Sequence, residues 1–186
     1  KEIDAFKRIA ADNRLEHIVV NYSLKESDYV VEAILDEAKE SGADIIVIGT
    51  TGAKGLKEIF FGSVASKVIE NATCPVFMVP DTATYKGIQK IGLTLEYKTG
   101  EPELIEKSLA FTRKLQGHLH CLHVDVYDPE KTKVKLLEYK EAFKHQSDIT
   151  FHVHYELDVE KGILEFMKFN QIDVVIMRVQ HQSMLK

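Results

Sequence analysis

The sequence has few cysteines, no long apolar run and no excess of basic residues, and each shortage excludes a class of protein. The two cysteines, Cys74 and Cys121, lie at or within apolar segments and predict free buried thiols rather than a disulfide framework. The net charge of −5 argues against nucleic-acid binding through a basic surface. No apolar stretch approaches the length of a membrane span. We therefore expect a cytoplasmic protein that binds neither nucleic acid nor a membrane.

Strand-like and helix-like segments alternate along the 186 residues. This alternation predicts an α/β fold, an open parallel sheet with helices on both faces. In the first part of the chain we expect helices at 2–12, 28–41 and 63–72, and strands at 17–22, 44–48 and 76–79. In the second part we expect strands at 88–97, 118–126, 149–156 and 172–179, and helices at 102–116, 130–144 and 158–170.

A weak internal repeat relates the two parts. The pattern Val30-x3-Ile34-Leu35-Asp36 returns as Val159-x3-Ile163-Leu164-Glu165. At the same offset, Asp44-Ile45-Ile46-Val47 returns as Asp173-Val174-Val175-Ile176. Because the register is constant across a helix and a strand, the pattern predicts a tandem duplication, with a first repeat at 1–81 and a second at 82–186.

One loop carries the strongest functional signal. Gly49-Thr50-Thr51-Gly52, nine further residues and then Gly62-Ser63 connect the strand at 44–48 to the helix at 63–72. A strand that leads through a glycine-rich loop into a helix is a common way to hold a phosphate, because the backbone can approach the anion and the first helical N–H groups point at it. Lys54 or Lys57 would add positive charge. The alternative is a plain strand-to-helix connection in which Ser63 only caps the helix.

Residues 43–80, with the spacing G-x2-G-x9-G-S, resemble the universal stress protein family. The resemblance implies a site for ATP, or for AMP or another adenine nucleotide, with Mg2+ alongside it. The residues that it places in this site are Gly49, Thr50, Gly52, Ala53, Gly62, Ser63, Val64 and Ala65. The family also uses an acidic residue at the end of its opening strand. The first repeat contains no such strand, and in the second repeat Glu96 lies near that position.

The resemblance implies a nucleotide-dependent regulatory or interaction protein of the stress response, and not an enzyme. The alternative is a nucleotide-free protein–protein interaction module of the same fold. A slow ATP hydrolase or self-phosphorylating protein would need a base and metal ligands, and no catalytic residue is assigned. Family members associate through their last strand, so the strand Val76–Val79 predicts a homodimer or an intrachain pseudo-dimer.

The second repeat departs from the family at the loop. Aligning Asp44 with Asp173 puts Arg178 opposite Gly49 and His181 opposite Gly52. These large side chains predict that the second repeat binds no nucleotide there. In family terms the first repeat lacks its opening strand, first helix and second strand, and the second repeat lacks its final helix and final strand. We therefore expect a fragment of a longer tandem protein, with exchange of segments between chains as the other interpretation.

Histidines raise the question of a metal. His118, His120, His152 and His154 lie on two strands that are neighbours in the family's sheet order, so a four-imidazole zinc site is geometrically allowed. Histidines at sheet edges more often form local hydrogen bonds or face solvent. The sequence therefore assigns no metal ligand.

Overall fold

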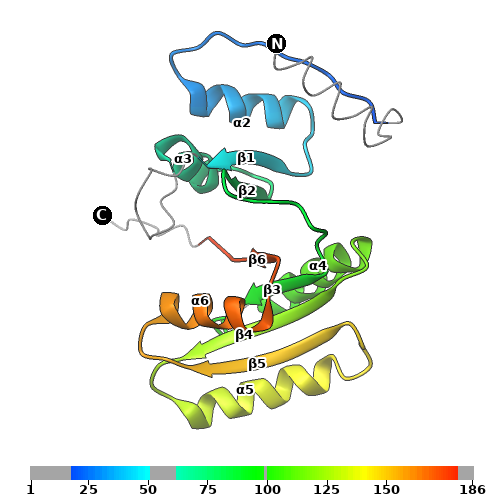
Figure 1. Cartoon of the computed structure of the whole chain (residues 1–186), viewed down its shortest axis with the longest axis vertical. Helices are drawn as coiled ribbons and strands as arrows, with labels where there is room; N and C mark the ends of the chain where they lie inside the picture. Colours follow the sequence, from blue (N-terminus) through cyan, green and yellow to red (C-terminus); the bar gives the residue numbers. More distant parts are fainter. Residues whose placement is uncertain (1–17, 51–61, 99, 180–186) are drawn as a thin grey trace. The chain divides into compact units, whose positions relative to one another are not determined.

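The structure is a computed structural model that describes residues 18–50, 62–98 and 100–179. The chain divides into two units, Lys1–Pro80 and Asp81–Lys186. Both are built from parallel strands and helices (Figure 1), as the sequence predicts. The expected helix at 2–12 lies outside the described residues. No helix within the described ranges is long and apolar enough to cross a membrane.

The first unit contains two helices and two strands in the described ranges. They are α2 (Val30–Glu40), β1 (Ile46–Thr50), α3 (Ser63–Asn71) and β2 (Val76–Pro80). The strands β1 and β2 pair in parallel, with Ile46 opposite Val76. Helix α2 ends where expected, because Gly42 has a φ of +64° that a residue with a side chain rarely adopts.

Helix α3 packs on α2, β1 and β2. Its buried residues are Ala65 and Val68, which are 3% and 0% exposed. Val64, although apolar, is 36% exposed. Val64 directly precedes Ala65, so the 100° step along the helix turns its side chain off the buried stripe.

The predicted strand at 17–22 is wrong over its described residues. Residues 18–22 form no strand, and Val19 and Leu24 are 84% and 92% exposed. The alternating apolar residues suit a half-buried strand, but a strand also needs a hydrogen-bonding neighbour. None of the described strands pairs with this segment.

The second unit holds a parallel sheet of four strands in the order β5-β4-β3-β6. Its elements are β3 (Lys90–Thr94), α4 (Glu101–Lys114), β4 (His118–Asp125), α5 (Pro129–Ala142), β5 (Ile149–Tyr155), α6 (Val159–Asn170) and β6 (Val174–Ile176). The expected pairing of the two histidine-bearing strands is confirmed, because β4 and β5 are neighbours. Strand β6 is shorter than predicted because its pairing with β3 runs only from Val174 to Ile176. Strand β3 is also shorter than predicted, and its length matches its pairing with β4 from Lys90 to Thr94.

Helices cover both faces of this sheet. The larger core joins strand residues such as Leu93 and Leu119 to Ile105 of α4 and Tyr139 of α5. The opposite face joins Leu122 and Val124 to Phe166 of α6, the helix that crosses in front of the strands in Figure 1. Cys121 lies in the larger core as a free thiol, and burial raises its pKa, which disfavours the reactive thiolate form.

Candidate functional site

The site that the sequence predicts begins at the carboxyl end of β1. Thr50, the last residue of β1, is buried, and Gly49 before it is exposed. The chain is described again from Gly62, and α3 begins at Ser63. The predicted site residues Gly52 and Ala53, together with Lys54 and Lys57, lie outside the described residues.

Helix α3 starts one residue earlier than a serine cap would require. Gly62 is the N-cap, with φ −57° and ψ 151°, and its carbonyl accepts the Ser66 N–H at 3.0 Å. Ser63 is therefore the first helical residue, and no side chain caps the helix. The interpretation of Ser63 as an N-cap is wrong for this reason.

The first turn of α3 presents main-chain donors. The N–H groups of Ser63, Val64 and Ala65 precede the first hydrogen bond of the helix, so none has a partner within it. The first turn contains no acidic side chain that would compete with an anion for these donors. The helix dipole makes the same end favourable for negative charge.

Both described glycines of the loop have open surroundings. A Cβ atom placed on Gly49 or on Gly62 would meet no described atom within 4 Å. A groove does form between α2 and α3, lined by Val31, Glu32, Leu35, Lys67 and Asn71. It includes none of the predicted site residues, so the candidate site remains the end of β1 and the start of α3.

The equivalent place in the second unit holds a large side chain. Arg178, which aligns with Gly49, donates from Nη2 to the carbonyl of Gly100 at 3.0 Å, at the start of α4. His181 lies outside the described residues. Glu96, the residue near the family's acidic position, pairs with Lys98, and its backbone N–H donates to Glu101 Oε1 at 2.6 Å.

Sequence reasoning missed Glu101, a buried carboxylate at this same end of the second unit. Glu101 is 3% exposed, and its Oε2 accepts the Tyr139 hydroxyl at 3.0 Å. Burial and this bond raise the pKa of Tyr139. The sequence does carry a signal for this residue, because a glutamate directly before Pro102 is typical of the first turn of a helix. Its contacts join α4 to α5 and to the segment that follows β3, which is a structural role.

The histidines form local hydrogen bonds, as expected. His120 Nδ1 lies 3.3 Å from His152 Nε2, His118 Nε2 lies 3.2 Å from Thr150 Oγ1, and His154 Nε2 lies 3.2 Å from Glu165 Oε2. His154 is therefore hydrogen-bonded to Glu165 and not to the other three histidines. As the side chains stand, no three His, Cys, Asp or Glu residues of the described part are placed to hold a metal ion.

Fold and site define an α/β protein whose first unit offers a helix N-terminus beside a strand end. The universal stress protein family matches residues 3–80. Universal stress protein MJ0531 of Methanocaldococcus jannaschii is 54% identical over 46 residues, which are 25% of this chain and 27% of that protein. YxiE of Bacillus subtilis is 52% identical over 46 residues, which are 25% of this chain and 31% of that protein. MJ0577 of M. jannaschii is 36% identical over 77 residues, covering 37% of this chain and 48% of that protein.

Solved structures resemble nearly the whole chain. A universal stress protein from Archaeoglobus fulgidus matches with a TM-score of 0.70 at 20% identity, covering 94% of this chain and 65% of the other. A putative universal stress protein from Pseudomonas aeruginosa matches with a TM-score of 0.73 at 16% identity, covering 98% and 70%. At these identities the likeness shows the fold alone.

Residues 3–80, in the first unit, belong by sequence to the universal stress protein family. The family match lies in the first unit, and the structural likeness extends the fold to the second. The chain spans between a quarter and a half of the length of the three relatives above, 27% to 48%.

Proposed function

We propose that the first unit binds an adenine nucleotide, ATP or AMP or a related adenylate, at the carboxyl end of β1. The observation that carries this proposal is the first turn of α3, whose three main-chain donors follow Gly62 and have no partner within the helix. The proposed residues are Gly49, Thr50, Gly52, Ala53, Gly62, Ser63, Val64 and Ala65.

The phosphates would bind through the backbone. Amides of the first turn donate to phosphate oxygens, and the helix dipole adds about 0.3–1 kcal/mol for a nearby negative charge. The exposed backbone of Gly49 and the space around Gly62 allow a close approach. Mg2+ bound with ATP would neutralise phosphate charge, and no described residue is assigned as its ligand.

The proposed role is regulatory. Binding would change association or conformation in the cytoplasm, and turnover is not part of the proposal because no catalytic base is assigned among the described residues at the start of α3. The second unit would take no part in nucleotide binding, because Arg178 lies against Gly100 where the first unit has a glycine.

Equilibrium binding of labelled ATP to the full chain tests this function. Gly62→Val should weaken binding at least tenfold, about 1.4 kcal/mol, because the new side chain enters the space where phosphate would sit. Valine tolerates the φ of −57° and ψ of 151° found there, so the fold should persist. Asn71→Val, which puts the same side chain at the other end of α3, is the matched control and should bind as the parent does.

Two results would contradict the proposal. One is the absence of ATP, ADP or AMP binding at millimolar concentration, and the other is equal binding by both valine variants. A turnover assay with and without Mg2+ tests the hydrolase alternative in the same samples.

Exposed apolar residues on the first unit favour a second candidate, a nucleotide-free interaction module. Ile45 and Val47 are 41% and 63% exposed, although they lie at or in β1. We propose that this unit associates through β2, either as a homodimer or with the second unit of the same chain. Both strands of the two-stranded sheet have one unpaired edge among the described residues.

Sedimentation velocity over a range of concentrations separates the two arrangements. A homodimer dissociates on dilution, whereas an intrachain pair gives a monomer at every concentration with slowly exchanging amides in β2. A monomer with rapidly exchanging β2 amides would contradict both.

A further inference from the structure

Three imidazoles converge on one hydroxyl group in the second unit. Thr150 Oγ1 lies 3.2 Å from His118 Nε2, 3.3 Å from His120 Nδ1 and 3.0 Å from His152 Nε2. His120 Nδ1 and His152 Nε2 are themselves 3.3 Å apart. We refer to these four residues as the histidine cluster.

Strand register brings the cluster together. His118 and His120 are alternate residues of β4, and Thr150 and His152 are alternate residues of β5. Thr150 lies opposite His120, so the four side chains share one face of the sheet. This is the face that α6 covers, because the His152 ring lies 5.0 Å from the Phe166 ring, centroid to centroid.

The separations suit a small metal ion. Zinc lies about 2.0–2.1 Å from each imidazole nitrogen, so two ligand atoms of a tetrahedral site are about 3.3 Å apart. Four distances within the cluster, 3.0 to 3.3 Å, match that edge. The two other distances join His118 to His120 and to His152. Because no three ligands are in place as the side chains stand, His118 must turn its ring to complete the set.

His118 has the freedom to turn. It is the first residue of β4 and only partly buried, and its ring nitrogen Nε2 forms a hydrogen bond with the Thr150 hydroxyl. A metal ion would replace that bond. His120 and His152 already have the required separation, so two of the three imidazoles need no large movement.

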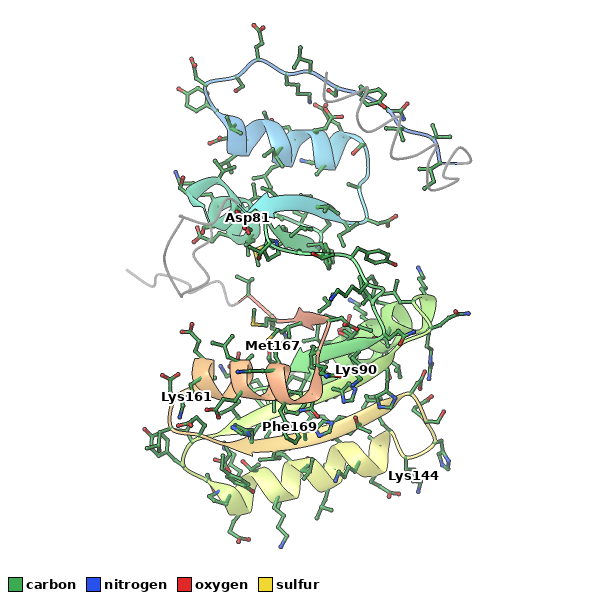
Figure 2. The ribbon with its side chains drawn as sticks, in the orientation of Figure 1. Asp81, Lys90, Lys144, Lys161, Met167 and Phe169 are labelled. Atoms are coloured by element: carbon green, nitrogen blue, oxygen red, sulfur yellow. The ribbon has the colours of Figure 1, made fainter. Side chains whose placement is uncertain are left out.

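Two lysines limit the affinity. Figure 2 shows Lys90 near the amino end of the sheet, and its ammonium group donates to the Asn170 carbonyl at 3.0 Å. Lys90 and Lys140 both act electrostatically on the cluster, and no carboxylate belongs to it. We therefore expect weaker binding than at a structural zinc site made with thiolates.

We propose that His118, His120 and His152 bind one divalent transition-metal ion, such as Zn2+, with the Thr150 hydroxyl or a water molecule as the fourth ligand. Imidazole is a preferred ligand for this class of ion, whereas Mg2+ and Ca2+ prefer oxygen. The ion would join β4 to β5 at the amino end of the sheet and stabilise the second unit.

Calorimetric titration of the full chain with ZnCl2 provides the test, and Co2+ absorption spectra report the coordination geometry. We expect one ion per chain and tetrahedral Co2+ bands, with binding at least tenfold weaker in His120→Ala and in His152→Ala. His154→Ala is the matched control, because it removes the next histidine on the same face of β5 and should leave binding unchanged.

His118→Ala is the variant expected to keep its fold, because it changes a partly exposed residue at a strand end. It should weaken zinc binding while hydrogen exchange in β4 and β5 without metal stays as in the parent. Zinc should raise the melting temperature of the parent and not of His118→Ala. Absence of zinc binding, or binding that survives all three cluster substitutions, would overturn the proposal.

Discussion

Gly117 sits where β3 and β4 begin to pair, and replacing it with alanine should separate the two strands at that end. A Cβ atom at Gly117 would lie 2.6 Å from Ile91 Cδ1 and 2.7 Å from the Gln89 carbonyl oxygen. That carbonyl also accepts the His118 N–H at 2.7 Å, as the first hydrogen bond along this edge of β4. The clash with the Gln89 carbonyl is with backbone, so no change of rotamer relieves it.

The magnitude follows from the overlap. Ordinary contact begins at 3.4 Å, so the two atoms must move by about 0.8 Å and 0.7 Å. Inserting a methylene group into a packed core costs about 1–3 kcal/mol. The loss of unfolded-chain entropy on changing glycine to alanine returns about 0.4–1 kcal/mol. We expect Gly117→Ala to lower the free energy of unfolding of the second unit by about 1–2 kcal/mol.

Hydrogen exchange followed by mass spectrometry resolves the effect without requiring the two units to unfold together. Amides of Lys90–Thr94 and His118–Asp125 should exchange about 5–30 times faster in Gly117→Ala than in the parent. Gly49→Ala is the control, because a Cβ there meets no described atom. If exchange in these strands is the same in the parent and in Gly117→Ala, the steric argument fails.

Three further predictions concern ionisable groups of the second unit. Asp173 Oδ2 accepts two backbone N–H groups at the start of β3, both at 2.9 Å, and these bonds lower the pKa of Asp173. Asp173→Asn should therefore lower the free energy of unfolding by about 1–2 kcal/mol at pH 7, as measured by denaturant titration. The lowered pKa stabilises the fold at pH values above the unfolded pKa of 3.8, so the difference in unfolding free energy between variant and parent should shrink as the pH falls below 3.8. A difference that does not depend on pH would contradict this account. Glu101→Ala leaves the buried Tyr139 hydroxyl unpaired and should destabilise by about 1–3 kcal/mol, more than Tyr139→Phe measured in the same assay. Burial, with nearby Glu101, raises the pKa of Tyr97 to about 12, so ultraviolet titration should lose one tyrosine transition near pH 12 in Tyr97→Phe.

The positions of most elements could be predicted from the sequence because local signals fix helix ends. Gly42 ends α2, Pro102 lies in the first turn of α4, and the apolar stripe of α3 places Ala65 and Val68 in the core. The neighbouring positions of β4 and β5 followed from the resemblance to the family. These features depend on short-range pattern, which a single sequence carries.

The errors arose where the structure depends on partners. The segment 18–22 has the composition of a strand, but no described strand pairs with it. Ser63 has the chemistry of an N-cap, yet Gly62 occupies that position. The histidine cluster depends on the register between β4 and β5, which places His120 opposite Thr150 and leaves His154 beside Glu165. Composition alone does not determine which partner a residue meets.

The two units differ at the positions that the internal repeat in the sequence aligns, Gly49 and Arg178. In the first unit Gly49 adds no side chain, and the first turn of α3, nearby in sequence, presents main-chain donors that have no partner within the helix. In the second unit Arg178 stands at the aligned position, and its guanidinium donates to the Gly100 carbonyl. The hydrogen bond from Arg178 to the Gly100 carbonyl stabilises the start of α4, and the same contact places the Arg178 side chain where a ligand would otherwise have room. Conversion of Arg178 to glycine would therefore remove a stabilising bond without supplying the donors of a helix such as α3, and we expect it to create no nucleotide site.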